Sequence, residues 1–257
     1  MLSLKEIEKF YPEYLQKFSR FLLREYLQYK ILEIIFESKY ATNLAFIGGT
    51  CLRIVHGNTR FSEDLDFDNF DLSEREFTEL SEIIKDKLQK QGYIVEIKNV
   101  IAGAFHCYVR FPGILFNESL SGHVEEKILI QLDTEAHKFE YDTKKYILNK
   151  FDVFTSINVT PPEILLSQKF YALINRKRKK GRDFFDIIFL LKYTRPDYNY
   201  LKQKLDIDND TELKNVIFSE VNKIDLKDMA DDVQKFLFYP EDVKRIMHFK
   251  DYIEQIF

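Results

Sequence analysis

Hydrophobic and polar residues repeat along this chain with two different periods, and the change of period divides it into segments. Residues 4–39 carry apolar side chains every three or four positions, which predicts helices, and Pro12 is expected to divide them. Residues 44–47 form a short apolar run that ends at a glycine pair, and residues 50–56 return to helical spacing until Gly57. We therefore expect a strand, a tight turn and a short helix.

A second group of segments repeats with the period of a strand. Asp64 to Asp68 alternates carboxylate and apolar side chains, and strand-like segments follow at 93–100, 105–111 and 127–135. Residues 73–91 between them have helical spacing, with Ser73 and Glu76 as a capping box. The fold class predicted for the first half is therefore α+β, with a small mixed sheet flanked by helices.

The second half of the chain is predicted to be helical. Thr160, Pro161 and Glu163 have the residue types of an N-cap, a first-turn proline and a third-position glutamate, which predicts a helix from about residue 161 to 176. Helical spacing continues to the end of the chain, apart from an acidic segment at 206–212. We expect two lobes, a catalytic lobe at 1–155 and a helical lobe at 156–257.

Composition narrows the class of protein. With 257 residues, 45% hydrophobic and 31% charged, the chain can bury a sizeable core, and wholesale disorder is excluded. It has no apolar run long enough to span a membrane and no secretion signal, so we expect a cytoplasmic protein without a membrane partner. The net charge of -4 argues against a protein that is basic all over, so any contact with nucleic acid must come from a local patch.

Cys51 and Cys107 lack the spacing of a metal or redox motif and are expected to be buried.

The alternating acidic segment is the first candidate for chemistry. On a strand, residues i and i+2 point the same way, so Asp64 and Asp66 are expected to project side by side while Leu65 and Phe67 anchor the opposite face. Carboxylates held close together repel unless a cation neutralises them, and Mg²⁺ or Mn²⁺ suits such ligands and also binds phosphate oxygens. The same alternation also occurs on solvent-facing strands, so both interpretations stay open for this motif alone.

The glycine pair precedes the acidic segment at a suitable distance. Gly48, Gly49 and Thr50 lie between a predicted strand and a helix start, where backbone N–H groups and the helix dipole favour phosphate. A glycine pair alone is also typical of an ordinary turn. Thirteen residues separate Thr50 from Asp64, enough for one short helix and a return into the next strand. Together the two motifs predict a site for a metal-bound nucleoside triphosphate.

Charged residues also lie on the packing faces of the predicted helices. Lys169 and Arg176 share a stripe with Leu165 and Ala172, and a lysine there must reach either water or an anion such as a phosphate or carboxylate. On the next helix Arg182 and Asp186 are four residues apart and are expected to pair, while Asp183 or Asp186 orients Lys169. Structural and catalytic roles remain open for both aspartates.

A basic run joins these two helices. It contains six cations in seven residues, Arg176 to Arg182. Such a run is typical of a solvated loop, and beside a nucleotide site it also suits the phosphates of RNA. The candidate RNA ligands are Arg176, Lys177, Arg178, Lys179 and Lys180.

The chain resembles the nucleotidyltransferase superfamily in the residues FIGGT and, after thirteen further residues, DLDF. Within that superfamily, it resembles the AbiEii/AbiGii toxin family in GGTCLRIVHGNTRFSEDLDF together with QKFYALINRKRKKGRDFFDI. The resemblance covers about residues 40–195. This family is the nucleotidyltransferase component of bicistronic toxin–antitoxin and phage-defence systems.

The resemblance implies further site residues. It implies a third carboxylate on a strand beside the first two, for which Asp133 is our choice and Glu135 the reserve; Asp133 also has the position of a strand-end aspartate that caps a turn. Arg60 and Ser62 match the family pattern R-x-S-x-D-x-D, where Ser62 would bind a phosphate, hold an aspartate or cap the loop. The candidate nucleotide ligands are Gly48, Gly49, Thr50, Arg60, Ser62, Lys169 and Arg182, and the candidate catalytic residues are Asp64, Asp66, Asp133, Lys169, Asp183 and Asp186.

Residues and resemblance together predict an enzyme. Asp64, Asp66 and Asp133 would hold Mg²⁺ or Mn²⁺ and the triphosphate, and a nucleoside monophosphate would pass to an acceptor hydroxyl with release of pyrophosphate. The resemblance implies a tRNA acceptor and an antitoxin partner. The alternatives are transfer to a small molecule such as an aminoglycoside, and a non-catalytic nucleotide- or RNA-binding module on the same fold.

Overall fold

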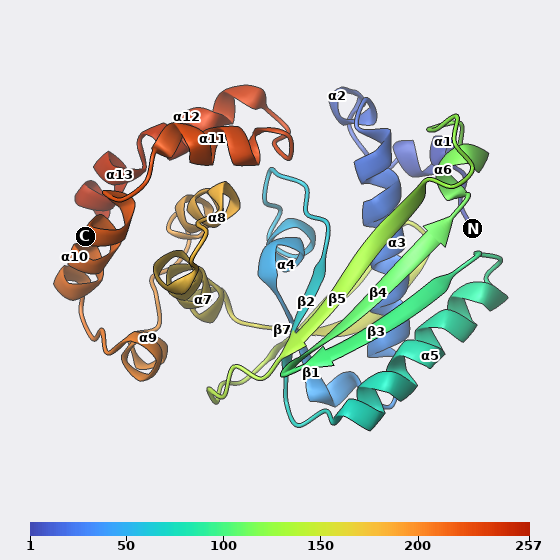
Figure 1. Cartoon of the computed structure of the whole chain (residues 1–257), viewed down its shortest axis with the longest axis horizontal. Coiled ribbons are helices and arrows are strands. Elements are labelled where there is room, and N and C mark those ends of the chain that lie inside the picture. Colours follow the sequence, from blue (N-terminus) through green and yellow to red (C-terminus); the bar gives the residue numbers. More distant parts are fainter. The chain divides into compact units, whose positions relative to one another are not determined.

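Seven strands form one mixed sheet in the order β3-β4-β5-β2-β1-β7-β6 (Figure 1). The structure, a computed structural model, describes residues 1–257. Parallel pairing joins β1 to β7 and β2 to β5, and the other neighbouring strands pair antiparallel. The strands are β1 (Leu44–Ile47), β2 (Leu65–Asn69), β3 (Glu96–Ala102), β4 (Ala104–Pro112), β5 (Lys127–Glu135), β6 (Lys144–Lys150) and β7 (Val153–Val159).

One face of this sheet is apolar and packs against helices. The ring of Phe67 on β2 lies 6.2 Å from the ring of Phe36 on helix α3, and Phe105 on β4 lies 5.4 Å from Phe77 on helix α5. Because successive side chains of a strand point to opposite faces, the residues beside Phe67 and Phe105 face the other way. The carboxylate-bearing face of β2 is therefore the face that α3 and α5 do not cover.

The sheet and its helices make up the first of two compact units, Met1–Cys51 with Ser62–Val159. Its helices are α1 (Leu4–Glu8), α2 (Glu13–Gln16), α3 (Ser19–Phe36), α5 (Glu74–Lys90) and α6 (Ile114–Asn117), with a 3-10 turn η1 (Ala41–Asn43). Helix α4 (Gly48–Ile54) follows β1, and the chain leaves the first unit within it. Both halves of the capping box at Ser73 and Glu76 are present at the start of α5.

The second unit consists of residues Leu52–Phe61 and Thr160–Phe257. Its helices are α7 (Pro162–Asn175), α8 (Gly181–Leu190), α9 (Tyr198–Leu205), α10 (Asp210–Val221), α11 (Leu226–Gln234), α12 (Lys244–Met247) and α13 (Phe249–Ile256), with a 3-10 turn η2 (Pro240–Val243). Asp197, Asn209 and Asp225 cap α9, α10 and α11 through their side chains. At Gly181 an added Cβ would lie 1.9 Å from the backbone oxygen of Met229, so the start of α8 requires glycine to pack against α11.

The α+β class with a small mixed sheet is confirmed, but two strands and one cap were not predicted correctly. Strands β6 and β7 occupy residues 144–159, where polar and charged side chains hide the strand period. The N-cap of α7 is Pro161 and not Thr160, which is fully buried. Residues 52–61 belong to the second unit because the backbone at Phe61 and Thr59 bonds to that at Phe236 and Phe238.

The prediction that both cysteines are buried is confirmed. Cys51 and Cys107 are both fully buried, and burial raises the pKa of each thiol, that of Cys107 to about 12.

None of the helices combines the length and the hydropathy needed to cross a lipid bilayer.

Candidate active site

The glycine turn and the acidic strand meet within the first unit. Gly48 has a φ of +76°, and a Cβ added to it would lie 2.1 Å from Oδ2 of Asp66. The carboxylate of Asp66 therefore occupies the space that a side chain at residue 48 would need. β1 and β2 pair antiparallel, with Ile47 opposite Asp66, which brings the turn after β1 to this carboxylate.

Gly48→Ala is expected to destabilise the protein and to displace the carboxylate of Asp66. The left-handed backbone alone costs about 1–3 kcal/mol for a residue with a Cβ, and the contact with Oδ2 adds to that cost. Gly57→Ala is the matched control, because Gly57 has a similar φ of +74° and no atom within 4 Å of an added Cβ. Urea unfolding of both variants measures the difference, and equal losses in the free energy of unfolding would contradict the close approach.

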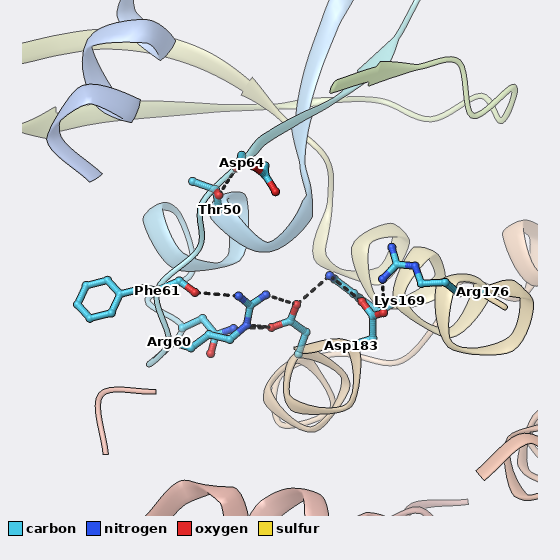
Figure 2. A network of polar contacts seen from close by, with 9 residues as sticks. Thr50, Arg60, Phe61, Asp64, Lys169, Arg176 and Asp183 are labelled. Carbon is cyan, nitrogen blue, oxygen red and sulfur yellow. Dashed lines mark hydrogen bonds and ion pairs between the residues drawn. The ribbon is translucent and has the colours of Figure 1, made fainter. Parts of the chain in front are cut away.

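The backbone at Asp64 is fixed from two sides. The hydroxyl of Thr50, the third residue of the glycine turn, donates to the backbone oxygen of Asp64 (Figure 2). The buried amide of Gln28 on α3 donates to the backbone oxygens of Ser62 and Glu63 at 3.1 and 3.0 Å. Helix α3 and the turn therefore hold the segment that leads into β2. Gln28 was not predicted, because its partners lie far away in the sequence.

Asp133 lies beside Asp66 on the neighbouring strand. β2 and β5 pair in parallel with Asp66 opposite Asp133, so the two side chains are on one face of the sheet. Oδ1 of Asp133 lies 2.6 Å from Nδ1 of His106 and 2.8 Å from Nε2 of Gln131. Sequence reasoning missed His106 and Gln131, although both lie on strands that had been predicted.

The remaining carboxylates of this region differ in environment. Asp68 is buried and accepts hydrogen bonds from the backbone of His137 at 3.0 Å and from the hydroxyl of Tyr141 at 2.9 Å, which ties the loop after β5 to the sheet. Glu135, the reserve candidate, pairs in register with Asp68 and is exposed. Asp68 therefore acts as a structural anchor.

The residues present fit a divalent cation that is held jointly with a nucleotide. No three carboxylate, imidazole or thiolate groups lie close enough to hold an ion by themselves. Mg²⁺ usually takes one or two protein carboxylates and completes its shell with water and substrate phosphates, so it needs no cage built only of protein. Asp66 and Asp133 on adjacent strands could supply two hard oxygen ligands, and Asp64 lies two residues before Asp66.

The second unit contains a buried network of ion pairs (Figure 2). Nζ of Lys169 on α7 lies 3.4 Å from Oδ1 of Asp183 and 2.8 Å from Oδ2 of Asp186, both on α8. Arg176 adds a contact of 2.6 Å to Asp183. The carboxyl group of Asp186 is fully buried and that of Asp183 nearly so. Two cations, Lys169 and Arg176, therefore lie beside the two carboxylates, and a third, Arg60, pairs with Asp186.

Arg60 reaches this network from the segment 52–61. Its Nε and Nη2 donate to the two oxygens of Asp186 at 2.7 and 2.6 Å, and Nη1 donates to the backbone oxygen of Phe61. Asn58 donates to Asp186 as well, at 2.9 Å. The arginine partner of Asp186 is thus Arg60 and not Arg182, whose guanidinium lies over the ring of Phe236, 5.0 Å from its centroid.

Electrostatics keep this network charged. Burial disfavours the ionised form of Asp186, but Arg60 and Lys169 outweigh it, so the pKa of Asp186 is lowered from its ordinary value. Burial likewise disfavours the charged form of Lys169, but Asp186 and Asp183 outweigh it, so the pKa of Lys169 is raised. Asp186 and Lys169 are therefore both held in their charged states.

Some residues of the basic run form ion pairs within the protein and others do not. Arg176 pairs with Asp183, and Lys179 pairs with Glu220 at 2.7 Å. Lys177 and Arg178 are exposed and have no carboxylate partner. The run borders a cavity of about 700 Å³, which acidic residues of α10 and α11 line on the other side.

A family model described as the nucleotidyl transferase AbiEii toxin of a type IV toxin–antitoxin system matches residues 30–252. None of the curated proteins matches the sequence significantly. The fold is similar to that of JHP933 from Helicobacter pylori, with a TM-score of 0.58 and 19% identity over 92% of this chain and 91% of that one. A second Helicobacter pylori protein, provisionally named a nucleotidyltransferase, has a TM-score of 0.55 and 18% identity over 92% of this chain and 95% of its own.

Proposed function

The chain belongs to the AbiEii family of nucleotidyl transferase toxins of type IV toxin–antitoxin systems, and from this premise we propose that it transfers a nucleoside monophosphate from a nucleoside triphosphate to a tRNA hydroxyl. The observation that carries the proposal is the contact between the glycine turn and the acidic strand. Gly48 lies against the carboxylate of Asp66, which pairs in register with Asp133. A proposed partner is the antitoxin of the same system.

In this proposal the first unit binds the nucleotide. Asp66 and Asp133, with Asp64, hold a divalent cation such as Mg²⁺ or Mn²⁺, and the backbone of Gly48, Gly49 and Thr50 receives the phosphates. The bound cation neutralises charge on the phosphate oxygens and favours in-line displacement. The acceptor hydroxyl gives its proton to a carboxylate of the site, for which Asp133 is the candidate, as its oxygen bonds to the α-phosphorus, and the bond to the β-phosphate breaks to release pyrophosphate.

The second unit supplies cations in the same proposal. Lys169 neutralises phosphate charge that develops in the transition state. Asp183 or Asp186 orients its ammonium group, and contacts of 3.4 and 2.8 Å support both assignments. Arg60 is buried against Asp186, so we assign it to positioning and not to direct contact with the nucleotide. Ser62 and Arg182 stay candidates for nucleotide contact.

The deciding experiment is incubation of the protein with each α-labelled NTP, Mg²⁺ and total tRNA. Transfer of label to RNA together with release of pyrophosphate is the expected result. Transfer only to a small-molecule acceptor such as an aminoglycoside would replace the tRNA part of the proposal. Nucleotide binding without transfer to any acceptor would favour a non-catalytic binding module.

Lys177 and Arg178 are proposed to bind tRNA phosphates. The double substitution Lys177→Ala/Arg178→Ala is expected to weaken tRNA binding and to reduce the slope of log Kd against log salt by about 1–2, because each phosphate contact releases condensed counterions. Lys144→Ala/Lys145→Ala is the matched control, since these two neighbouring lysines are exposed on β6. Filter binding at several salt concentrations measures both, and an identical slope for the two double variants would remove the basic run from the RNA site.

A further inference from the structure

Three polar side chains form a row across three neighbouring strands of the sheet. Asp66 on β2 is opposite Asp133 on β5, and Asp133 is opposite His106 on β4. Residues that pair in register on adjacent strands have their side chains on the same face. The row therefore runs from the acidic motif through the third carboxylate to an imidazole that the proposed chemistry leaves without a role.

The contacts of Asp133 are directional. His106 Nδ1 lies 2.6 Å from Oδ1, while the amide nitrogen of Gln131 lies 2.8 Å from Oδ1 and 3.0 Å from Oδ2. An imidazole with its hydrogen on Nδ1 is the tautomer that can donate to a carboxylate in this arrangement. Two donors approaching from different strand positions fix the rotation of the carboxylate about its χ2 bond. Oδ1 thus has two donors, and one lone pair of Oδ2 stays available for another ligand.

Neither partner of this bond is buried, which sets it apart from a structural core contact. The side chain of His106 is 29% exposed and that of Asp133 is 31% exposed. A hydrogen bond at a half-exposed position adds little to stability. The hydrogen bond does restrict the Asp133 carboxylate to one orientation, whereas a carboxylate without partners rotates among several orientations in water. The next residue on β4, Cys107, is by contrast fully buried.

We propose that His106 is a positioning residue, which holds the carboxylate of Asp133 in the orientation that lets it share a divalent cation with Asp66. This inference rests on the proposed function, since it assigns a task to the same carboxylates. Hydrogen bonds to a ligating carboxylate or imidazole orient it before the ion arrives, and their loss typically lowers metal affinity or activity by about 10- to 100-fold. Gln131 provides the second bond of the same kind.

The test compares two replacements of His106. His106→Leu removes the donor at similar size, whereas His106→Asn keeps a donor, because the asparagine amide nitrogen is as many bonds from Cα as Nδ1 is. Mn²⁺ affinity by electron paramagnetic resonance, with a saturating non-hydrolysable nucleoside triphosphate present, is expected to fall about 10- to 100-fold in His106→Leu and to stay within about 3-fold of the parent in His106→Asn. His123→Leu in an exposed loop is the matched control.

Further readouts separate positioning from folding and from failure of the proposed function. His106→Leu should lower kcat while KM for the tRNA acceptor stays unchanged, with a melting temperature close to that of the parent. Equal Mn²⁺ affinity in His106→Leu and the parent, or an equal loss in His106→Asn and His106→Leu, overturns the positioning role. A parent protein that binds no Mn²⁺ and transfers no nucleotide overturns the proposed function itself, and the assignment of His106 with it.

Discussion

Asp66→Asn is expected to reduce nucleotidyl transfer by about 10³-fold, because it removes one of the charged oxygen ligands that the proposed reaction needs to neutralise the triphosphate. The structure makes this residue more informative than any other acid of the chain. Its carboxylate fills the space above Gly48 and lies in register with Asp133. An amide of the same size keeps the packing against the glycine, so the loss reports on charge and not on shape.

The measurement is single-turnover transfer of α-label under saturating NTP, with pyrophosphate release as an independent readout. Asp64→Asn is expected to behave in the same way. Asp86→Asn on α5 is the matched control, since Asp86 is exposed and pairs only with Lys90, 2.7 Å away. Retention of a tenth or more of the parental rate in Asp66→Asn, with Mg²⁺ as the only cation, would contradict the assigned role.

Asp186→Leu is expected to lower the free energy of unfolding by about 3–5 kcal/mol, the usual cost of removing one partner from a buried ion pair. Asp186 is fully buried and accepts from both Nε and Nη2 of Arg60, from Lys169 and from Asn58. Its removal takes from the buried guanidinium of Arg60 the carboxylate to which both Nε and Nη2 donate. Lys169 keeps Asp183 as a partner, so most of the loss should come from Arg60.

A double-mutant cycle isolates that contribution. Arg60→Met alone is expected to be destabilising as well, but the double variant Arg60→Met/Asp186→Leu should lose less than the sum of the two single losses, because it leaves no isolated charge between this pair. Urea unfolding of the four proteins gives the coupling energy. Strict additivity would mean that the two groups do not interact in solution.

The free energy of unfolding is also expected to depend on pH through these ion pairs. The pKa of Asp186 is lowered from 3.8, so its contribution to stability is present above that value and is lost as pH falls through the still lower pKa of the folded state. The pKa of Lys169 is raised from 10.5, so its contribution is present below that value and is lost as pH rises through the higher folded pKa. Asp186→Leu should therefore lose part of the acid dependence of unfolding that the parent displays.

Local patterns in the sequence predicted those parts of the structure that local interactions determine. The capping box at Ser73 depends on residues three positions apart, and the strand at the acidic motif depends on alternation within five residues. The order of strand, glycine pair and short helix was also predicted, although the helix begins at Gly48 itself and not after the glycines. The close approach of Gly48 to Asp66 gives a physical reason for that glycine which the sequence alone does not contain.

Interactions between distant residues account for what was missed. Arg60 and Asp186 are 126 positions apart, and Arg182 was the nearer choice for a helix pair, so only the folded chain identifies the partner. His106 and Asp133 meet because β4 and β5 pair in one particular register. A strand period around residue 106 puts His106 on a polar face, but that period does not say which strand lies beside it.

The chain passes between the two units at residues 51–52, 61–62 and 159–160. A truncated form ending at Val159 would retain residues 52–61 but would lack Asp186 on α8 and the segment after α11, which those ten residues contact. Arg60 would then lack Asp186, which accepts from both its Nε and its Nη2. Neither unit therefore corresponds to one continuous segment of the sequence. To express the two units separately, residues 52–61 would have to be replaced by a linker in the first unit and added to the second.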